Sequence, residues 1–444
     1  MHTDKIKNPE IMLNKFTMWQ GLKWLLYLAA FGIWIKTGMT VEKDSQSYIN
    51  MLPMVGPGYP IFIKITTLFG AIHSYFLTGL VALLIGFVIV HRFVDFLKNQ
   101  FNLSQVSVIA SSIILLLPYF QSHIANNILT ESVAYPLFIW AMHLFLKSAF
   151  EKNKSQAIAY LFVTVLLLLV RSQFAFFHII SFILILYLTW FQANKIKFIL
   201  PLLGIFVFTV LSVGLIERTY HLALHNRFMP SPFIGIQLET MPLYNIQDKD
   251  LALFPDTIQQ GLVDTVLSSL KKSELYHINE KSKTSEYEVF KYLHSYSLIS
   301  WQTSVKYLSN ILSHKNLHRK DMDYWIYIDQ VTTKVAITLI KAHPKEYAWQ
   351  YFADFKSAFG DWPFLIFFII YFISGIIYFF KTGNKLSIFL VVSGLIMILN
   401  VTLICFFEFP IDRYLFYTQY LIMVVVFISI IKTLEANSQE ITIN

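Results

Sequence analysis

Carboxylates and arginines beside long apolar segments are the side chains of this sequence best suited to chemistry. Glu42 and Asp44 follow the first apolar segment, Glu131 lies at the start of another, and Arg171 and Arg413 stand at the ends of two more. A carboxylate can act as a base on an acceptor hydroxyl, phosphate or amine. Arginines can hold a phosphate group through paired hydrogen bonds and stabilise it as it leaves. The combination predicts group transfer from a phosphate-linked donor.

Four more polar residues occur in the same parts of the chain. We expect them to contribute to substrate binding: Tyr48, Tyr59, Asn126 and Tyr414. The histidines show no pair with a convincing metal-ligand spacing, and the single cysteine, Cys405, excludes a disulfide within one chain. We therefore assign no metal ligand.

The composition predicts a polytopic membrane protein. Of 444 residues, 56% are hydrophobic and only 14% are charged, whereas a soluble domain carries about 25% charged residues. The net charge of +8 does not indicate nucleic-acid binding, because the basic residues stand at the ends of apolar segments and form no basic stripe.

Ten apolar segments are candidates for membrane-spanning helices, each of which needs about 20 residues. They cover residues 20–39, 76–93, 106–120, 128–146, 157–170, 174–191, 198–216, 363–380, 386–406 and 414–431. Positive charge alternates between successive loops, so both chain ends are predicted to be cytoplasmic. Two of the segments flank Arg171, and a single long helix broken there is the alternative to two helices that meet at an outer turn.

This topology predicts an all-α protein with five parts. Residues 1–19 form a cytoplasmic N-terminus without a removable signal peptide, and residues 20–216 form a membrane core whose first outer loop is 40–75. Residues 217–362 form a mainly helical extracytoplasmic domain, residues 363–432 form the last membrane helices, and residues 433–444 form a cytoplasmic tail.

The first outer loop contains a predicted interfacial helix. Pro60 suits the first turn of a helix, and the apolar residues that follow share one helical face: Ile61, Ile65, Leu68, Phe69 and Ile72. A helix of this kind lies along the membrane surface, where it could help to shape a groove for a lipid tail.

In these features the chain resembles the GT-C glycosyltransferases. The similar features are Asp44, Ser45 and Tyr48 in the first outer loop, Gly58-Tyr59-Pro60 at the start of the interfacial helix, Leu129-Thr130-Glu131-Ser132, and Arg413-Tyr414. The closest similarity is to bacterial members grouped with protein O-mannosyltransferases and the lipid A aminoarabinose transferase. It covers roughly the first 200 residues and the last 80, and the extracytoplasmic domain lies outside it.

The resemblance implies a function and roles for residues. The function is transfer of a sugar from a polyprenyl-phosphate carrier to an extracytoplasmic glycan or lipid, in the bacterial inner (plasma) membrane, with the active site on the extracytoplasmic side. Asp44 matches the family's catalytic aspartate, a general base or an orienting group for the acceptor. Glu42 fits its acidic-x-acidic pattern, Glu131 is a second acidic residue of the cavity, and Arg171 and Arg413 would hold the donor phosphate. Some members bind a divalent metal, which leaves a metal cofactor open.

The same residues have structural interpretations. Asp44 and Glu42 could be solvated loop residues, and Glu131 could favour a helix N-terminus, with Thr130 or Asn127 as its cap. Arg171 could extend to the membrane interface, and Arg413 could pair with Asp412 or Glu408.

Two other functions are compatible with the sequence. An O-antigen polymerase or ligase would use arginines on a lipid-linked phosphate without requiring Asp44. A lipid or solute transporter would place ionisable residues near the membrane midplane, often within inverted repeats; here the charges stand at helix ends.

Overall fold

The chain folds into helices throughout the part that the structure describes. The computed structural model describes residues 9–69, 74–273, 275–276, 285–360 and 362–443, and in these ranges the one β-type pairing is an isolated bridge between Thr40 and Asn127. The helices of the bundle and its first connection are α1 (Pro9–Thr37), α2 (Ser45–Ile49), α3 (Gly58–Leu68), α4 (Ser74–Phe101), α5 (Gln105–Gln121), α6 (Glu131–Glu151), α7 (Lys154–Val170), η1 (Ser172–Phe176), α8 (Phe177–Trp190), α9 (Lys195–His225), α16 (Trp362–Thr382), α17 (Lys385–Phe407) and α18 (Asp412–Ile443).

Seven helices in the described residues are long and apolar enough to cross a membrane. They cover Tyr75–Phe101, Glu131–Glu151, Ser172–Trp190, Lys195–His225, Trp362–Thr382, Lys385–Phe407 and Asp412–Glu435. Two shorter apolar helices, α5 and α7, and the 29-residue α1 accompany them. Each of the ten predicted segments overlaps a helix, so the prediction of an all-helical membrane protein agrees with the fold.

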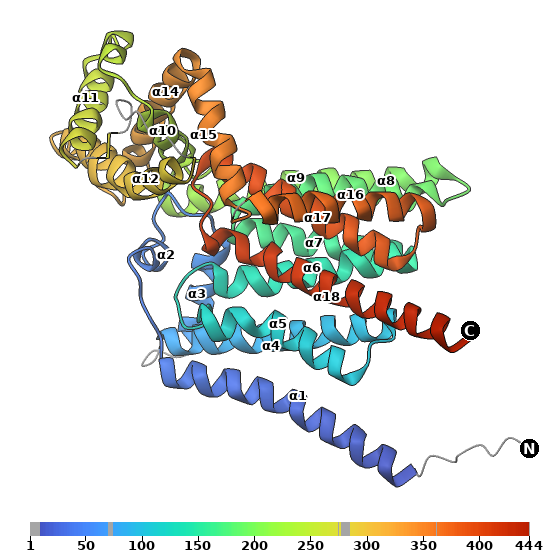
Figure 1. The fold of residues 1–444 in the computed structure, drawn as a ribbon. Coiled ribbons are helices and arrows are strands. Elements are labelled where there is room, and N and C mark those ends of the chain that lie inside the picture. The colour runs from blue at the N-terminus through green and yellow to red at the C-terminus, as the bar shows by residue number, and fades with distance from the viewer. Residues whose placement is uncertain (1–8, 70–73, 274, 277–284, 361, 444) are drawn as a thin grey trace, which may run out of the picture.

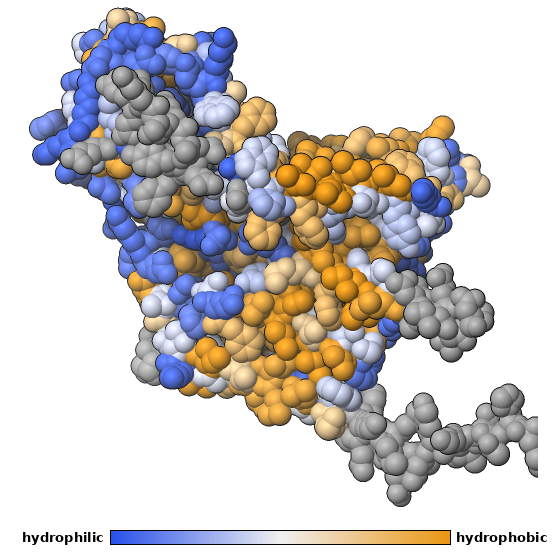
Figure 2. Space-filling model, in the orientation of Figure 1, coloured by the Kyte–Doolittle hydropathy of each residue, from blue (hydrophilic) through white to orange (hydrophobic). Residues whose placement is uncertain are grey.

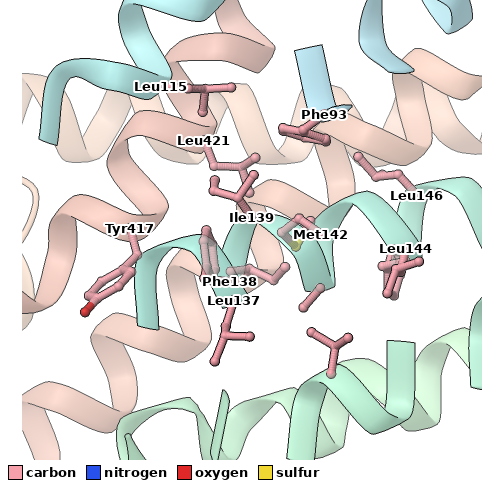
Figure 3. Close-up of a cluster of buried hydrophobic side chains, with 14 of the residues drawn as sticks. Phe93, Leu115, Leu137, Phe138, Ile139, Met142, Leu144, Leu146, Tyr417 and Leu421 are labelled. Carbon is pink, nitrogen blue, oxygen red and sulfur yellow. The ribbon is translucent and has the colours of Figure 1, made fainter. Parts of the chain in front are cut away.

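α6 is the central helix of the bundle. Within a hydrophobic stretch of 18 residues in each helix, 78% of the residues are buried in α6, against 11% in α9 and 17% in α16. Figure 3 shows its side chains Leu137, Phe138, Ile139 and Met142 among residues from α4, α5 and α18. A helix that is apolar on all sides is buried by its neighbours. Because the surrounding helices fix the position of α6, its first residue, Glu131, has a fixed position at one end of the bundle.

The chain reverses direction at Arg171. α7 ends at Val170, Arg171 has an extended backbone, and η1 and α8 return beside α7 (Figure 1). The alternative of one long broken helix is therefore wrong. Figure 1 shows the two described chain ends and the connection between α8 and α9 at the end of the bundle away from α10 to α15.

The remaining helices form a separate unit, here called the outer domain. It consists of α10 (Ile234–Tyr244), η2 (Asp248–Leu253), α11 (Thr257–Lys272), α12 (Ser285–Ser297), the π-helix η3 (Leu298–Ser304), α13 (Val305–Ser313), α14 (Met322–Ala342) and α15 (Pro344–Ser357). It has its own core, which includes Leu243, Val266, Ile328 and Leu339. Figure 2 shows hydrophilic residues over much of this domain and hydrophobic residues over the bundle. α9 continues past residue 216, the predicted end of the membrane helix, to His225.

α3 is the predicted interfacial helix. Its stripe of Ile61, Ile65, Leu68 and Phe69 is exposed, up to 81% at Phe69, while Ile72 lies outside the described residues. The opposite side packs on the bundle through Tyr59 and Ile63. Such an apolar face, unpaired with protein, fits a helix that lies in the membrane interface.

Candidate functional site

Four charged side chains from distant parts of the chain meet at the end of the bundle beside the outer domain. We call Asp44, Glu131, Arg171 and Arg413 the charge cluster. Nη1 of Arg171 lies 2.7 Å from Oε1 of Glu131, and Nη1 of Arg413 lies 2.9 Å from Oδ2 of Asp44. Nε of Arg413 also donates a hydrogen bond to Oε1 of Glu131. The structure thus brings together four of the residues proposed from the sequence.

Glu131 is the buried centre of the cluster. Its side chain is 5% exposed, and it is the first residue of α6. The positive end of a helix dipole stabilises a carboxylate at this position. Thr130 is the N-cap but makes no side-chain capping bond; its hydroxyl donates instead to Oε2 of Glu131 at 3.2 Å. Both carboxylate oxygens are therefore satisfied, as a buried charge requires.

Arg171 does not extend into the interface. Its side chain is only 10% exposed, and besides Glu131 it bonds to the hydroxyls of Thr130 at 3.1 Å and Tyr417 at 3.3 Å. Burial acts to lower the pKa of Arg171, but Tyr417 and Glu131 outweigh it and raise that pKa well above its usual range. The guanidinium therefore stays a cation. Its carbon also lies 4.9 Å from the ring centre of Tyr414, a cation–π contact.

Arg413 and Asp44 are the accessible members of the charge cluster. Their side chains are 28% and 59% exposed. Arg413 bridges Glu131 and Asp44, so the alternative interpretation, a pairing with Asp412 or Glu408, is wrong. The gradient of exposure means that a ligand arriving from outside would meet Asp44 and Arg413 before the buried pair behind them.

Amide side chains beneath the charge cluster fix Arg171 in place. Nε of Arg171 donates to Oε1 of Gln173 at 2.6 Å, and Nε2 of Gln173 donates to Oδ1 of Asn400 at 2.9 Å. Both amides also donate to the backbone carbonyl of Tyr414. The sequence analysis predicts no role for Gln173, Asn400 or Tyr417 in the site. Asn400 did carry a signal, because an amide inside an apolar segment is usually functional or paired.

Two tyrosines from the first loop and α3 adjoin the cluster. The rings of Tyr48 and Tyr59 pack edge to face, 5.3 Å apart, and the Tyr59 hydroxyl accepts a hydrogen bond from Ser132, 3.3 Å away. Burial, followed by the charge of Glu131, raises the pKa of Tyr48. Its hydroxyl is therefore protonated at neutral pH and can donate a hydrogen bond.

Gly58 allows α3 to reach the cluster. A side chain there would lie 2.6 Å from the backbone of Leu169 and Val170, at the end of α7. The start of α3 therefore lies directly against the turn that carries Arg171, and only glycine permits this approach.

Two predicted site residues lie outside these contacts. The Asn126 amide donates to the backbone carbonyls of Trp34 and Gly38 at 2.8 and 2.7 Å, and so ties the end of α1 to the segment before α6. Glu42 is exposed, and its backbone N–H donates to the hydroxyl of Ser45. Asn126 therefore has a structural role in these contacts. Glu42 is close to Asp44 because the two residues are neighbours in the same loop, not because their side chains interact.

Glu408 joins the outer domain to the bundle. It follows α17 and accepts hydrogen bonds from Nε2 of Gln237 at 2.6 Å and from the hydroxyl of Tyr296 at 3.3 Å. Gln237 lies in α10 and Tyr296 in α12. Since Tyr414 contacts Arg171 a few residues further on, the outer domain is anchored next to the charge cluster.

The described residues give little support for a metal centre. They contain no group of three or more His, Cys, Asp or Glu side chains placed to hold a metal ion. Glu42 and Asp44 provide two exposed carboxylates, fewer than such sites normally use.

Two surface cavities found in the bundle lie elsewhere. Their linings come from α4 and its neighbours, include His91 and Asp95, and contain no member of the charge cluster. The charge cluster therefore combines the buried pair Glu131 and Arg171 with the more exposed Asp44 and Arg413.

Comparison with known proteins adds no family to this description. No family model, curated protein or solved structure gives a match to this chain.

Proposed function

We propose that this chain is an integral-membrane glycosyltransferase of the GT-C type, which moves a sugar from a polyprenyl-phosphate carrier to an extracytoplasmic glycan or lipid. The observation that carries the proposal is the charge cluster, in which an exposed carboxylate lies beside an arginine that shares a buried glutamate with a second arginine. Base and phosphate-binding groups are the two components that this transfer needs.

The proposed reaction has one bond formed and one broken at the sugar. The acceptor oxygen attacks the anomeric carbon, and the bond from that carbon to the phosphate oxygen breaks. Asp44 takes the acceptor proton, and the polyprenyl phosphate leaves with the bonding electron pair. Arg413, the more exposed arginine, contacts the leaving phosphate, and Arg171 behind it adds positive charge. Tyr48 donates a hydrogen bond to a sugar or phosphate oxygen.

The membrane arrangement belongs to the same proposal. Ten spanning helices, with the seven long ones joined by α1, α5 and α7, would put both chain ends in the cytoplasm of a bacterial cell by the distribution of Lys and Arg. The charge cluster and outer domain would then face the extracytoplasmic side of the plasma membrane. The exposed stripe of α3 would contact the polyprenyl tail.

The experiment compares Asp44→Asn with Glu42→Gln in cells that lack the gene. Both carboxylates are exposed in the same loop, but only Asp44 pairs with Arg413. Envelope glycans and lipid carriers are measured by mass spectrometry at equal expression. We expect Asp44→Asn to lose one sugar from the glycan and to accumulate its polyprenyl-phosphate form, while Glu42→Gln restores the glycan. A glycan unchanged by Asp44→Asn would refute the assignment of Asp44.

A lipid-linked polymerase or ligase is the second candidate. One observation favours it: the contacts by which Arg171 and Arg413 share Glu131 do not include Asp44, so phosphate binding by the arginines would not require the aspartate. Loss of glycan in Arg413→Gln together with normal glycan in Asp44→Asn would select this function.

A further inference from the structure

The other end of the bundle contains a second polar region, independent of the charge cluster. Two cavities of about 440 and 480 Å³ lie there, and they share His91, Asp95 and Asn99 of α4. Residues of α1 and α5 complete the first cavity, and residues of α6 complete the second. The lining residues from α1 and α4 lie in the first part of α1 and in the second half of α4, and Figure 1 shows the start of α1 at the end of the bundle that carries the described chain ends.

Positive charge exceeds negative charge around these cavities. Their linings contain four cations, Lys23, Arg92, Lys98 and Lys147, and two carboxylates, Asp95 and Glu151. Nζ of Lys23 lies 2.7 Å from Oδ1 of Asp95. Within the described ranges, the side chains of the other three cations have no hydrogen bond or ion pair. Three cations are thus left to attract an anion.

The surroundings of the first cavity are those of a membrane interface. Trp24 is 58% exposed and stacks on His91, with ring centres 5.6 Å apart. Further along α1 and α4 towards the charge-cluster end, Leu28 and Val88 are also exposed. Tryptophan is enriched where hydrocarbon meets headgroups, so a ligand here can place a charged group in the cavity and an acyl chain on the apolar surface.

We propose that this region binds the phosphate headgroup of an anionic phospholipid in the adjacent leaflet. Basic pockets between membrane helices on the cytoplasmic side are suited to such headgroups. A free phosphate compound would satisfy the cations but would leave the exposed apolar side chains above them unused. The lipid would contact α1, α4, α5 and α6 and would hold α1 against the bundle, since α1 lies at its edge (Figure 1).

The test measures lipid retention by native mass spectrometry of the full chain, purified in detergent and titrated with phosphatidylglycerol or phosphatidylcholine. Arg92→Gln/Lys147→Gln removes two unpaired cations. The matched control, Lys249→Gln/Lys334→Gln, removes two exposed lysines of the outer domain. We expect the first pair to weaken phosphatidylglycerol binding by about fivefold per charge and the control to leave it unchanged.

A third variant distinguishes a specific loss of lipid binding from a loss caused by misfolding. Glu151→Gln removes an exposed carboxylate from the second cavity, and we expect tighter binding of phosphatidylglycerol, which an unfolded chain would not show. The proposal is overturned if Arg92→Gln/Lys147→Gln retains phosphatidylglycerol as wild type does, or if phosphatidylcholine binds equally well. Displacement of the lipid by millimolar inorganic phosphate or glycerol phosphate would identify a soluble phosphate compound as the ligand instead.

Discussion

Arg413 donates a hydrogen bond from Nε to Oε1 of Glu131, although 282 positions separate the two residues in the chain. The bond joins the first turn of α18 to the first residue of α6. The same carboxylate oxygen is paired with Arg171. One buried glutamate therefore sets the spacing between the two arginines that we propose for phosphate binding.

Replacement of Glu131 by Gln should destabilise the protein. The substitution leaves Arg171 buried without a counter-charge, and breaking a buried ion pair costs about 3–5 kcal/mol. Thermal unfolding in detergent measures this effect, with Glu42→Gln as the exposed control. If Glu131→Gln and Arg413→Gln act through the same contact, their effects in the double variant will be smaller than the sum. Additive changes in stability would show that the contact between Glu131 and Arg413 does not contribute to stability.

Replacement of Arg413 by Lys should impair activity more than stability. Arg413 uses Nε for Glu131 and Nη1 for Asp44, whereas lysine has a single charged nitrogen and lacks this forked geometry. We expect transfer to fall by about 10²–10³, the usual effect of losing one electrostatic donor. In vitro transfer from a polyprenyl-phosphate sugar, normalised to folded protein, would measure it. Full activity in Arg413→Lys would show that a point charge suffices.

Glu239→Gln should change how stability depends on pH. Glu239 lies in α10, completely buried, and burial raises its pKa well above its usual range; the nearby Ser304 hydroxyl lowers it by less. Neither carboxyl oxygen has a hydrogen-bond partner among the described residues. The folded state thus holds Glu239 neutral, while the unfolded chain ionises it near pH 4.3.

The sign of this effect follows from proton binding. Above about pH 4.3 the folded state binds one more proton than the unfolded state. The contribution of Glu239 to the free energy of unfolding is therefore complete below this pH, and it is lost as the pH rises through the pKa of Glu239 in the folded state. The slope reaches about 1.4 kcal/mol per pH unit. We expect unfolding midpoints of wild type to fall between pH 5 and 8 more steeply than those of Glu239→Gln. Parallel curves would contradict this prediction.

Gly58→Ala should separate α3 from the end of α7. Its Cβ would lie 2.6 Å from the backbone of Leu169, so one of the two helices must move. Gly204→Ala in α9 is the matched control, because open space surrounds that position and alanine favours helix over glycine by about 1 kcal/mol. We expect a lower melting temperature for the first variant and an unchanged or higher one for the second. The opposite order would refute the close packing of α3.

Much of the fold could be predicted from hydrophobic patterning. The apolar segments overlap the bundle helices, and the stripe of Ile61, Ile65 and Leu68 correctly predicted a helix with an exposed apolar face. Helix ends were less predictable, because α9 continues to His225 through residues that are no longer uniformly apolar. A helix can extend into water, and hydropathy alone does not show where it stops.

The site could be predicted only in part. Asp44, Glu131, Arg171 and Arg413 are conspicuous as charges at helix ends in an apolar chain. Their pairing depends on which helices are neighbours, and patterning does not specify this. The contacts of Arg413 with Glu131 and Asp44 could therefore not be predicted. Gln173 and Tyr417 were missed because amides and tyrosines at helix ends are common. Their role depends on the position of Arg171, which only the folded chain defines.

The order in which the charge cluster is completed follows the order of biosynthesis. Asp44, Glu131 and Arg171 belong to the first half of the chain, and Arg413 belongs to the last described helix. A nascent chain can form the Glu131–Arg171 pair early, but Arg413, the partner of Asp44 in the folded protein, is absent until the ribosome has made α18. A chain that terminates before α18 would keep the bridge between Thr40 and Asn127 but would lack the ion pair between Asp44 and Arg413. By the proposed function, chains cut short during translation would therefore be inert.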